Sequence, residues 1–220
     1  DHSDERTRAA LVARMEQEVV VLVSDAGTPL ISDPGYKLVR DARAAGRHVT
    51  TLPGPCAAIA AITLSGLPSD RFLFAGFLPN KAKARADTIA EFAGLRATLV
   101  FYESGPRLSA SLAALAEGLG DRDVAVAREI SKLYEECVIG TLSELAARYA
   151  DAPPKGEIVI VVAPPGDAVP EAADDATLDA ALRDAMADKP VAQAAKAVAK
   201  RFGLDRHDVY ARALTLKDSD

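Results

Sequence analysis

Several residue types are scarce in this chain, and each scarcity excludes a class of site. The 220 residues include two cysteines, three histidines and no tryptophan. Two cysteines in unrelated settings do not form a disulfide framework, and no Cys or His spacing fits a zinc site. Because His2, His48 and His207 are scattered along the chain, a His-dependent catalytic triad is also disfavoured.

Long apolar runs and several common motifs are lacking as well. No apolar run approaches the ~20 residues that a membrane helix needs, and no basic start followed by an apolar stretch marks a signal peptide. We therefore expect a cytoplasmic protein with no membrane partner. No Gly-x-Gly-x-x-Gly follows a strand, and neither a Walker lysine loop nor a Gly-x-Ser-x-Gly elbow occurs, which disfavours the usual dinucleotide, P-loop and hydrolase sites.

The net charge of −6 hides a division near the C-terminus. Residues 165–188 contain seven acids and one base, whereas residues 189–217 contain seven bases and two acids. Such local asymmetry is more informative than the total. A basic segment of this kind contacts DNA or RNA in some proteins and is only a solvated helix face in others.

Short apolar segments rich in β-branched residues alternate with helical patterns. Strands are predicted over 19–24, 48–52, 71–77, 97–103, 123–129, 134–140 and 157–163. Helices are predicted over 5–17, 36–45, 56–64, 81–92, 107–119, 142–149, 178–187, 191–202 and 206–214. This alternation predicts an α/β fold whose sheet is largely parallel in the first half. The short spacing between 123–129 and 134–140 predicts an antiparallel pair, and Thr141 with Glu144 forms a capping-box signature.

Two Gly- and Pro-rich stretches, 66–70 and 163–167, mark domain boundaries. They divide the chain into residues 1–69, a remainder of an N-terminal α/β domain, residues 70–166, a second α/β domain, and residues 167–220, an acidic linker with a small basic helical domain. In the last part, Pro190 fits a helix start, Gly203 a helix stop and Asp205 the next cap. Helix, Gly-containing turn and helix is the helix-turn-helix layout.

Four polar loops follow predicted strands or join them. They are residues 24–35 (SDAGTPLISDPG), 53–61 (PGPCAAIAA), 101–107 (FYESGPR) and 128–136 (REISKLYEE). Gly lets the backbone turn tightly and lets a ligand approach it, and open α/β sheets bind ligands beyond the carboxyl ends of their strands. The alternatives are ordinary turns, close helix–sheet packing and a solvated hairpin loop.

These loops, taken in order with their flanks, resemble the tetrapyrrole methylase superfamily, and within it the branch that modifies small-subunit ribosomal RNA. The matching stretches are 24–35, 52–58, 65–81 (SGLPSDRFLFAGFLPNK), 101–108, 127–136 and 156–162, and residues 189–216 are similar to that family's small helical domain. The resemblance implies two α/β domains with the cofactor in the cleft between them, a small C-terminal helix-turn-helix-like domain and a homodimer.

The resemblance also implies an activity: S-adenosylmethionine-dependent methylation of the ribose 2′-hydroxyl of a cytidine in the decoding region of small-subunit rRNA. The cofactor-binding positions carried over are Asp25, Gly27, Thr28, Pro55, Cys56, Ala57, Ala58, Tyr102 and Arg128. Cys56 stands where the family usually has Ser, and both side chains are small. The family begins with a strand and a Pro-x-Gly-Asn-Leu-Gly-Asp loop that the printed sequence lacks, so we expect the first strand and glycine loop of the N-terminal domain to be absent.

Transfer of a methyl group to a ribose hydroxyl calls for a base or hydrogen-bond acceptor. The candidates are Glu103, Glu129 and Lys132, of which Lys132 serves only with a depressed pKa. The residues expected to hold RNA phosphates are Lys81, Lys83, Arg85, Arg107, Lys196, Lys200 and Arg201. Two alternatives remain open: a tetrapyrrole (precorrin-type) methyltransferase, which the basic helical tail disfavours, and an inactive RNA-binding fragment.

Overall fold

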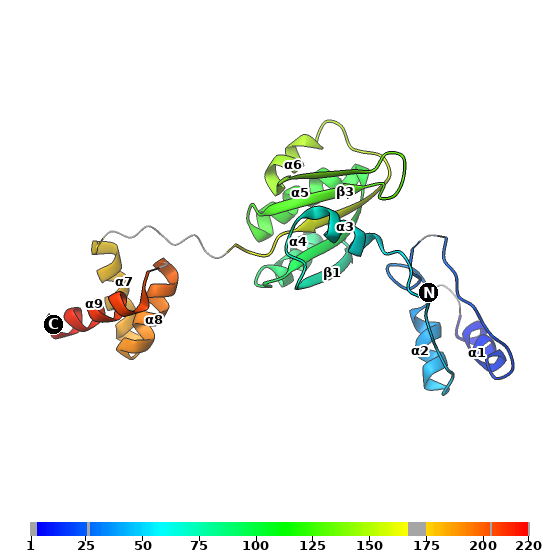
Figure 1. The fold of residues 1–220 in the computed structure, drawn as a ribbon, viewed down its shortest axis with the longest axis horizontal. Helices are drawn as coiled ribbons and strands as arrows, with labels where there is room; N and C mark the ends of the chain where they lie inside the picture. The colour runs from blue at the N-terminus through cyan, green and yellow to red at the C-terminus, as the bar shows by residue number, and fades with distance from the viewer. Residues whose placement is uncertain (1–3, 26, 167–174, 203, 220) are drawn as a thin grey trace. The chain divides into compact units, whose positions relative to one another are not determined.

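The computed structural model describes residues 4–25, 27–166, 175–202 and 204–219 of the chain. It divides into two compact units, residues 1–164 and residues 165–220. The first unit contains every strand of the described residues, whereas the second is helical (Figure 1).

A five-stranded mixed sheet organises the first unit. Its strands are β1 (Phe72–Phe77), β2 (Thr98–Ser104), β3 (Asp123–Arg128), β4 (Glu136–Thr141) and β5 (Glu157–Val162). Their order across the sheet is β1-β2-β5-β3-β4. β1 and β2 are parallel, while β5 runs antiparallel to both β2 and β3, and β3 runs antiparallel to β4. The predicted antiparallel pair is therefore confirmed, and among the strands of the described residues one of the four pairings is parallel.

The two faces of the sheet are covered differently. The helices α4 (Ala82–Phe92), α5 (Gly105–Leu119) and α6 (Leu142–Arg148) supply one core, together with Leu99, Phe101, Val126 and Ile160 of the strands. On the other face, α3 (Ala57–Ser65) packs on Val100, Ala125, Ala127 and Val161. Because successive strand residues point to opposite faces, β2 and β5 are apolar on both and are buried as central strands.

Local sequence signals set the ends of these helices. Thr141 caps α6 by accepting a hydrogen bond from the amide of Glu144, whose carboxylate accepts one from the Thr141 amide, so the predicted capping box is confirmed. Gly66 ends α3 in the left-handed conformation at φ 67°, where glycine avoids a Cβ clash. Pro106 lies in the first turn of α5, where its missing N–H costs nothing.

The segment before α3 contains two helices, α1 (Glu5–Arg14) and α2 (Tyr36–Ala44), which Arg8 joins through an ion pair of 3.0 Å to Asp41. The predicted strands over 19–24 and 48–52 are wrong, because neither range is a strand in the structure. Val19 is 92% exposed and Leu52 is 87% exposed.

These two strand predictions fail because a strand forms only when its backbone pairs with that of a neighbouring strand. A strand's backbone N–H and C=O groups must be paired with those of another strand, and no strand pairs with these two ranges among the described residues. A β-branched run alone does not supply that partner. Most of the apolar side chains in these segments are exposed, among them Val21, Val23 and Leu52.

The second unit is a three-helix bundle of α7 (Asp175–Asp188), α8 (Val191–Phe202) and α9 (Arg206–Ser219). Its core includes Leu182, Val198, Phe202, Val209 and Ala213. Asp205 caps α9 by accepting from the amides of His207 and Asp208, as predicted. Pro190 directly precedes α8 and its carbonyl accepts from the amide of Ala194, while Gly203 lies outside the described residues.

Candidate functional site

The first polar loop meets the turn that precedes α3. Thr28 donates a hydrogen bond of 2.9 Å from Oγ1 to the carbonyl oxygen of Pro55. Gly27 has φ +72°, a conformation that larger residues rarely adopt, and a Cβ at Gly54 would lie at an ordinary contact distance of 3.5 Å from the Thr28 hydroxyl oxygen. The structure therefore brings Gly27, Thr28 and Pro55 together, with Asp25 exposed in the same loop.

Tyr102 connects the sheet to the first turn of α3. Its hydroxyl oxygen accepts a hydrogen bond of 3.3 Å from the amide of Ala58. Its ring makes edge contacts with Phe74 at 4.7 Å and with Phe77 at 5.7 Å between ring centroids. Burial is the main cause that raises the pKa of Tyr102, and the nearby Cys56 adds to it. The phenol is thus a neutral group that fixes the start of α3.

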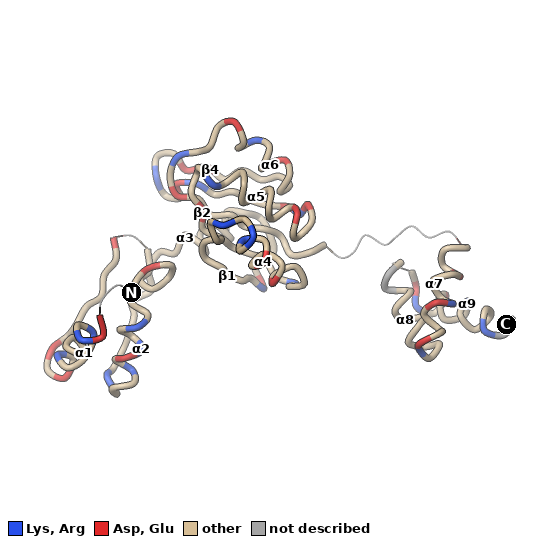
Figure 2. The backbone as a smooth tube through the Cα atoms, turned by 180° about the vertical axis from the view of Figure 1, so that it is seen from behind, with Lys and Arg blue, Asp and Glu red and all other residues tan. Residues whose placement is uncertain are grey.

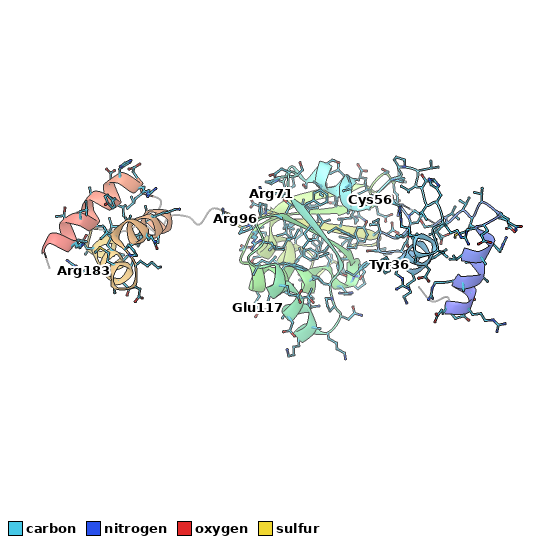
Figure 3. All side chains as sticks on the ribbon, turned by 90° about the horizontal axis from the view of Figure 1, so that it is seen from below. Tyr36, Cys56, Arg71, Arg96, Glu117 and Arg183 are labelled. Atoms are coloured by element: carbon cyan, nitrogen blue, oxygen red, sulfur yellow. The ribbon has the colours of Figure 1, made fainter. Side chains whose placement is uncertain are left out.

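The start of α3 is small and rich in backbone donors. Cys56 is its N-cap residue and makes no side-chain hydrogen bond to the helix. Among the described residues, the amides of Ala57 and Ile59 have no acceptor, whereas that of Ala60 donates to the Cys56 carbonyl. Free N–H groups at a helix start favour an anion, and alanine side chains leave the backbone accessible. Figure 3 labels Cys56 where the Pro-Gly-Pro turn enters the helix.

Sequence reasoning did not single out three residues that the structure adds to this cluster. Burial chiefly raises the pKa of Tyr102, and the charge of the Asp33 carboxylate adds a smaller contribution. Phe74 and Phe77 flank the Tyr102 ring. The sequence signal that could have indicated Phe74 and Phe77 was the FLFAGF segment itself. Its Gly76 lies at a bulge where the register between β1 and β2 shifts, and it faces the Ser32 hydroxyl.

The carboxyl ends of three strands share one edge of the sheet. β2 and β3 both run antiparallel to β5, so they point the same way, and β1 is parallel to β2. Phe77, Ser104 and Arg128 therefore end their strands at the edge where β5 begins with Glu157. This is the edge at which α/β sheets present their ligand loops.

Glu103 and Arg107 lie on the opposite face from Tyr102. The Glu103 carboxylate is enclosed: it accepts from the Ser104 amide at 2.8 Å and the Ser111 hydroxyl at 2.6 Å, and pairs with Arg107 Nε at 3.3 Å. Arg107 in turn donates to the carbonyl of Leu78. These contacts join β2, α5 and the end of β1, which is a structural arrangement and not that of an exposed base.

Arg128 is separated from Tyr102 by strand alternation. Arg128 and Glu103 are both aligned with Ile158, whereas Tyr102 and Ala127 are both aligned with Val159. The Arg128 guanidinium donates to the Lys155 carbonyl at 3.2 Å and lies 3.3 Å from a carboxylate oxygen of Glu136. The structure does not bring Arg128 together with the cluster around Tyr102.

Glu129 and Lys132 form a network of hydrogen bonds and ion pairs at the start of the loop between β3 and β4. The Glu129 carboxylate accepts from the Glu157 amide at 3.0 Å and from Lys132 Nζ at 3.1 Å, and Lys132 also reaches the Glu157 carboxylate at 2.8 Å. The Glu157 amide chiefly lowers the pKa of Glu129, and the Glu157 carboxylate chiefly raises the pKa of Lys132. The depressed pKa that a lysine base requires is therefore not met.

The residues predicted to hold RNA lie in both units. Lys81 is the N-cap of α4, Lys83 pairs with Asp87 at 2.8 Å, and Arg85 also belongs to α4. Figure 2 shows Lys and Arg positions in blue beside the α4 label. Lys196 is exposed on α8. The side chains of Lys200 and Arg201 lie outside the described residues.

Two kinds of site find no support in the part of the chain that the structure describes. No group of three or more His, Cys, Asp or Glu side chains is placed to hold a metal ion there. No helix within those residues is long and apolar enough to cross a membrane.

Comparison with protein-family models gives two matches. Residues 1–146 match the model described as Tetrapyrrole (Corrin/Porphyrin) Methylases, and residues 172–217 match the model of the RsmI C-terminal HTH domain. A protein of Erythrobacter litoralis named ribosomal RNA small subunit methyltransferase I is 58% identical, with 99% of this chain and 76% of that protein covered. A protein of the same name from Mesorhizobium japonicum is 45% identical, covering 100% and 74%.

Solved structures show the same fold at low identity. The methyltransferase CobJ has a TM-score of 0.55 at 19% identity and covers 79% of this chain and 76% of its own. Diphthine synthase has a TM-score of 0.56 at 17% identity and covers 74% and 67%. At these identities the likeness concerns the fold alone.

Proposed function

The chain belongs to the ribosomal RNA small subunit methyltransferase I family of the tetrapyrrole methylases, and on that premise we propose that it methylates the ribose 2′-hydroxyl of a cytidine in the decoding region of small-subunit rRNA. The proposed methyl donor is S-adenosylmethionine. The observation that carries the proposal is the contact of two loops far apart in sequence, at Thr28 and Pro55, beside the donor-rich start of α3.

The residues present fit this cofactor. Its amino-acid part carries a carboxylate, and the free amides of Ala57 and Ile59 at the start of α3 are suitable donors for such an anion. Cys56 and Ala57 are small and lie at least partly exposed, which leaves this backbone accessible. The proposed cofactor set comprises Asp25, Gly27, Thr28, Pro55, Cys56, Ala57, Ala58 and Tyr102. Arg128 fits a place beside the substrate better, because it lies on the other face of the sheet.

When bound, S-adenosylmethionine supplies a methyl group on a positively charged sulfur. The protein's part is to hold the ribose hydroxyl in line with that group, at about 3–3.5 Å before reaction. Of the three acidic and basic candidates, Glu129 fits the role of hydrogen-bond acceptor best, because its lowered pKa keeps it ionised at neutral pH. Glu103 is enclosed by its partners and Lys132 keeps its proton.

The proposed RNA contacts are electrostatic. Lys81, Lys83, Arg85 and Arg107 cluster around the start of α4 and the end of β1 in the first unit, and Lys196, Lys200 and Arg201 belong to α8 in the second. Lys and Arg neutralise phosphates and so supply affinity that is independent of sequence. The proposal includes a homodimer working on ribosomal RNA in the cytoplasm.

Labelled methyl transfer tests the proposal directly. The chain is incubated with methyl-labelled S-adenosylmethionine and, in parallel, with small ribosomal subunits, free small-subunit rRNA or a porphyrinoid. Label in RNA, at one position resistant to alkaline cleavage, is the expected result because a 2′-O-methyl group blocks that cleavage. Label in the porphyrinoid alone would favour the tetrapyrrole reading, and no label in any arm would favour an RNA-binding fragment.

A variant pair tests the cofactor loop. We expect Asp25→Ala to weaken S-adenosylmethionine binding by about tenfold or more, the size of a lost hydrogen bond to a charged group, with little effect on folding because Asp25 is exposed. Asp151→Ala removes another exposed carboxylate of the same unit and is the control. Calorimetric titration with equal affinities for the two variants would contradict the assignment.

A further inference from the structure

The C-terminal unit has a cavity that the proposed site does not use. Its volume is about 540 Å³, within the range of small-molecule sites. It lies between the last turns of α7, the turn into α8 and the last turn of α9. The residues that line it are Arg183, Met186, Ala187, Lys189, Pro190, Val191 and Lys217.

The rim of this cavity is cationic. Arg183, Lys189 and Lys217 come from three separate segments, and all three are exposed. No acidic side chain lines the cavity within the described residues, and none of the three cations has a hydrogen bond or ion pair with another described residue. The Asp179 carboxylate pairs with Arg212, which chiefly lowers the pKa of Asp179, and Arg183, labelled in Figure 3, adds to that lowering.

The floor of the cavity is apolar and fixed. Met186 and Val191 are partly buried and pack against the core of the bundle, and Pro190 stiffens the turn between α7 and α8. Cations around such a floor repel one another unless an anion lies between them. An anion with an apolar body therefore fits this cavity better than a free inorganic ion does.

We propose that this cavity binds one nucleotide of the RNA, with the phosphodiester held by Arg183, Lys189 and Lys217 and the ribose and base against Met186, Pro190 and Val191. The proposal rests on RNA being the substrate, as proposed above. It adds a contact in the second unit that is separate from the exposed face of α8. Arg supplies a planar set of donors and Lys a point charge, the two modes by which proteins hold phosphate.

Binding of a labelled single-stranded RNA oligonucleotide to the full chain tests the cavity. Lys189→Gln removes one charge at the rim, and Arg206→Gln removes one exposed charge of the same bundle outside the cavity. We expect Lys189→Gln to weaken binding roughly five- to tenfold and to reduce the slope of log K against log salt by about 0.7, the value for one phosphate on a single strand. Equal effects of the two variants would overturn the proposal.

A second variant blocks the cavity without changing the charge. Ala187 is an exposed helical residue that lines it, so Ala187→Trp fills the space and leaves the helix able to form, which circular dichroism checks. We expect the affinity for the oligonucleotide to fall several-fold or more. Each remaining phosphate contact should still contribute the same amount to the slope of log K against log salt. Unchanged affinity would mean that no nucleotide enters the cavity.

Two further measurements separate this proposal from the proposed function. Inorganic polyphosphate of equal charge should compete less well than the oligonucleotide, since it has no apolar body, and equal competition would overturn the nucleotide assignment. Methyl transfer by the unaltered chain is measured alongside. Absent transfer with cavity-dependent RNA binding would count against the activity alone, whereas transfer with cavity-independent binding would count against the cavity alone.

Discussion

Removing one oxygen atom from Tyr102 tests whether the sheet fixes the start of α3. Tyr102→Phe keeps the ring and its edge contacts with Phe74 and Phe77, but it removes the acceptor of the Ala58 amide. That amide then becomes a further unpaired donor in the first turn of the helix. The change therefore isolates a single hydrogen bond.

The structure sets the size of the effect. The bond between the Ala58 nitrogen and the Tyr102 oxygen is 3.3 Å long, beyond the usual 2.9–3.0 Å, and only partly buried. A typical hydrogen bond contributes about 0.5–1.5 kcal/mol net, and lost helix caps fall in the same range. We therefore expect the free energy of unfolding of the first unit to fall by about 0.5–1 kcal/mol, near the lower end.

Urea unfolding and amide hydrogen exchange provide the measurements. Exchange of the Ala58 amide should speed up more than exchange of amides in the central strand β2, because the effect is local. Tyr134→Phe is the matched control, since Tyr134 is 68% exposed in the loop between β3 and β4. Unchanged Ala58 exchange in Tyr102→Phe, or an equal loss of stability in Tyr134→Phe, would refute the reasoning.

Three further predictions concern packing and pH. Gly105→Ala should destabilise the chain by about 1–3 kcal/mol or more in urea unfolding, because the new Cβ would lie 1.7 Å from the Pro154 carbonyl oxygen. Gly156→Ala, at φ +100°, should displace the Glu129 carboxylate that a Cβ would approach to 2.3 Å, and so lower methyl transfer as well as stability. Burial chiefly raises the pKa of Tyr149, so stability should fall as the pH rises above about 10, the ordinary tyrosine value, and Tyr149→Phe should flatten that fall.

Each of these has a control and a contrary outcome. Gly94→Ala has open space around the new Cβ and should be nearly neutral, and Gly120→Ala has φ +82° with open space and so carries backbone strain without a clash. Losses equal to those of the packed glycines would show that sterics are not the cause. The sign of the pH effect follows because the folded state keeps a proton that the unfolded chain releases, and a rise in stability above pH 10 would contradict it.

The parts of the fold that the sequence predicted are those with local signals. The capping box of Thr141 and Glu144 and the cap by Asp205 are confirmed, because a helix start is encoded in adjacent residues. The pair formed by β3 and β4 is confirmed, because a short connection leaves antiparallel pairing as the available geometry. The strands predicted over 19–24 and 48–52 needed distant partners, which local β-branched composition does not reveal.

The candidate site likewise contains features that the sequence indicated and features that it did not. The resemblance pointed to the loop with Thr28, the turn with Pro55 and the strand with Tyr102, and the structure brings these together. Strand alternation alone separates neighbouring residues: Tyr102 and Glu103 must point to opposite faces, a consequence of period-two geometry that is readable from sequence. The link of Lys132 to Glu157 joins residues far apart in the chain and has no sequence signal.

The charge division near the C-terminus shows why a count of charges is not a map of a binding surface. Two acids of the acidic stretch, Asp175 and Asp179, fold onto Arg212 of the basic stretch, with distances of 2.6 Å and 2.5 Å to its guanidinium. That arginine is therefore not available to RNA, although sequence alone would count it. Arg183 belongs to the acidic stretch, forms no ion pair with the residues that the structure describes, and lines the cavity. The cationic surface of this unit thus combines residues from both stretches, and only the folded arrangement of α7 and α9 identifies which charges are left to bind a phosphate.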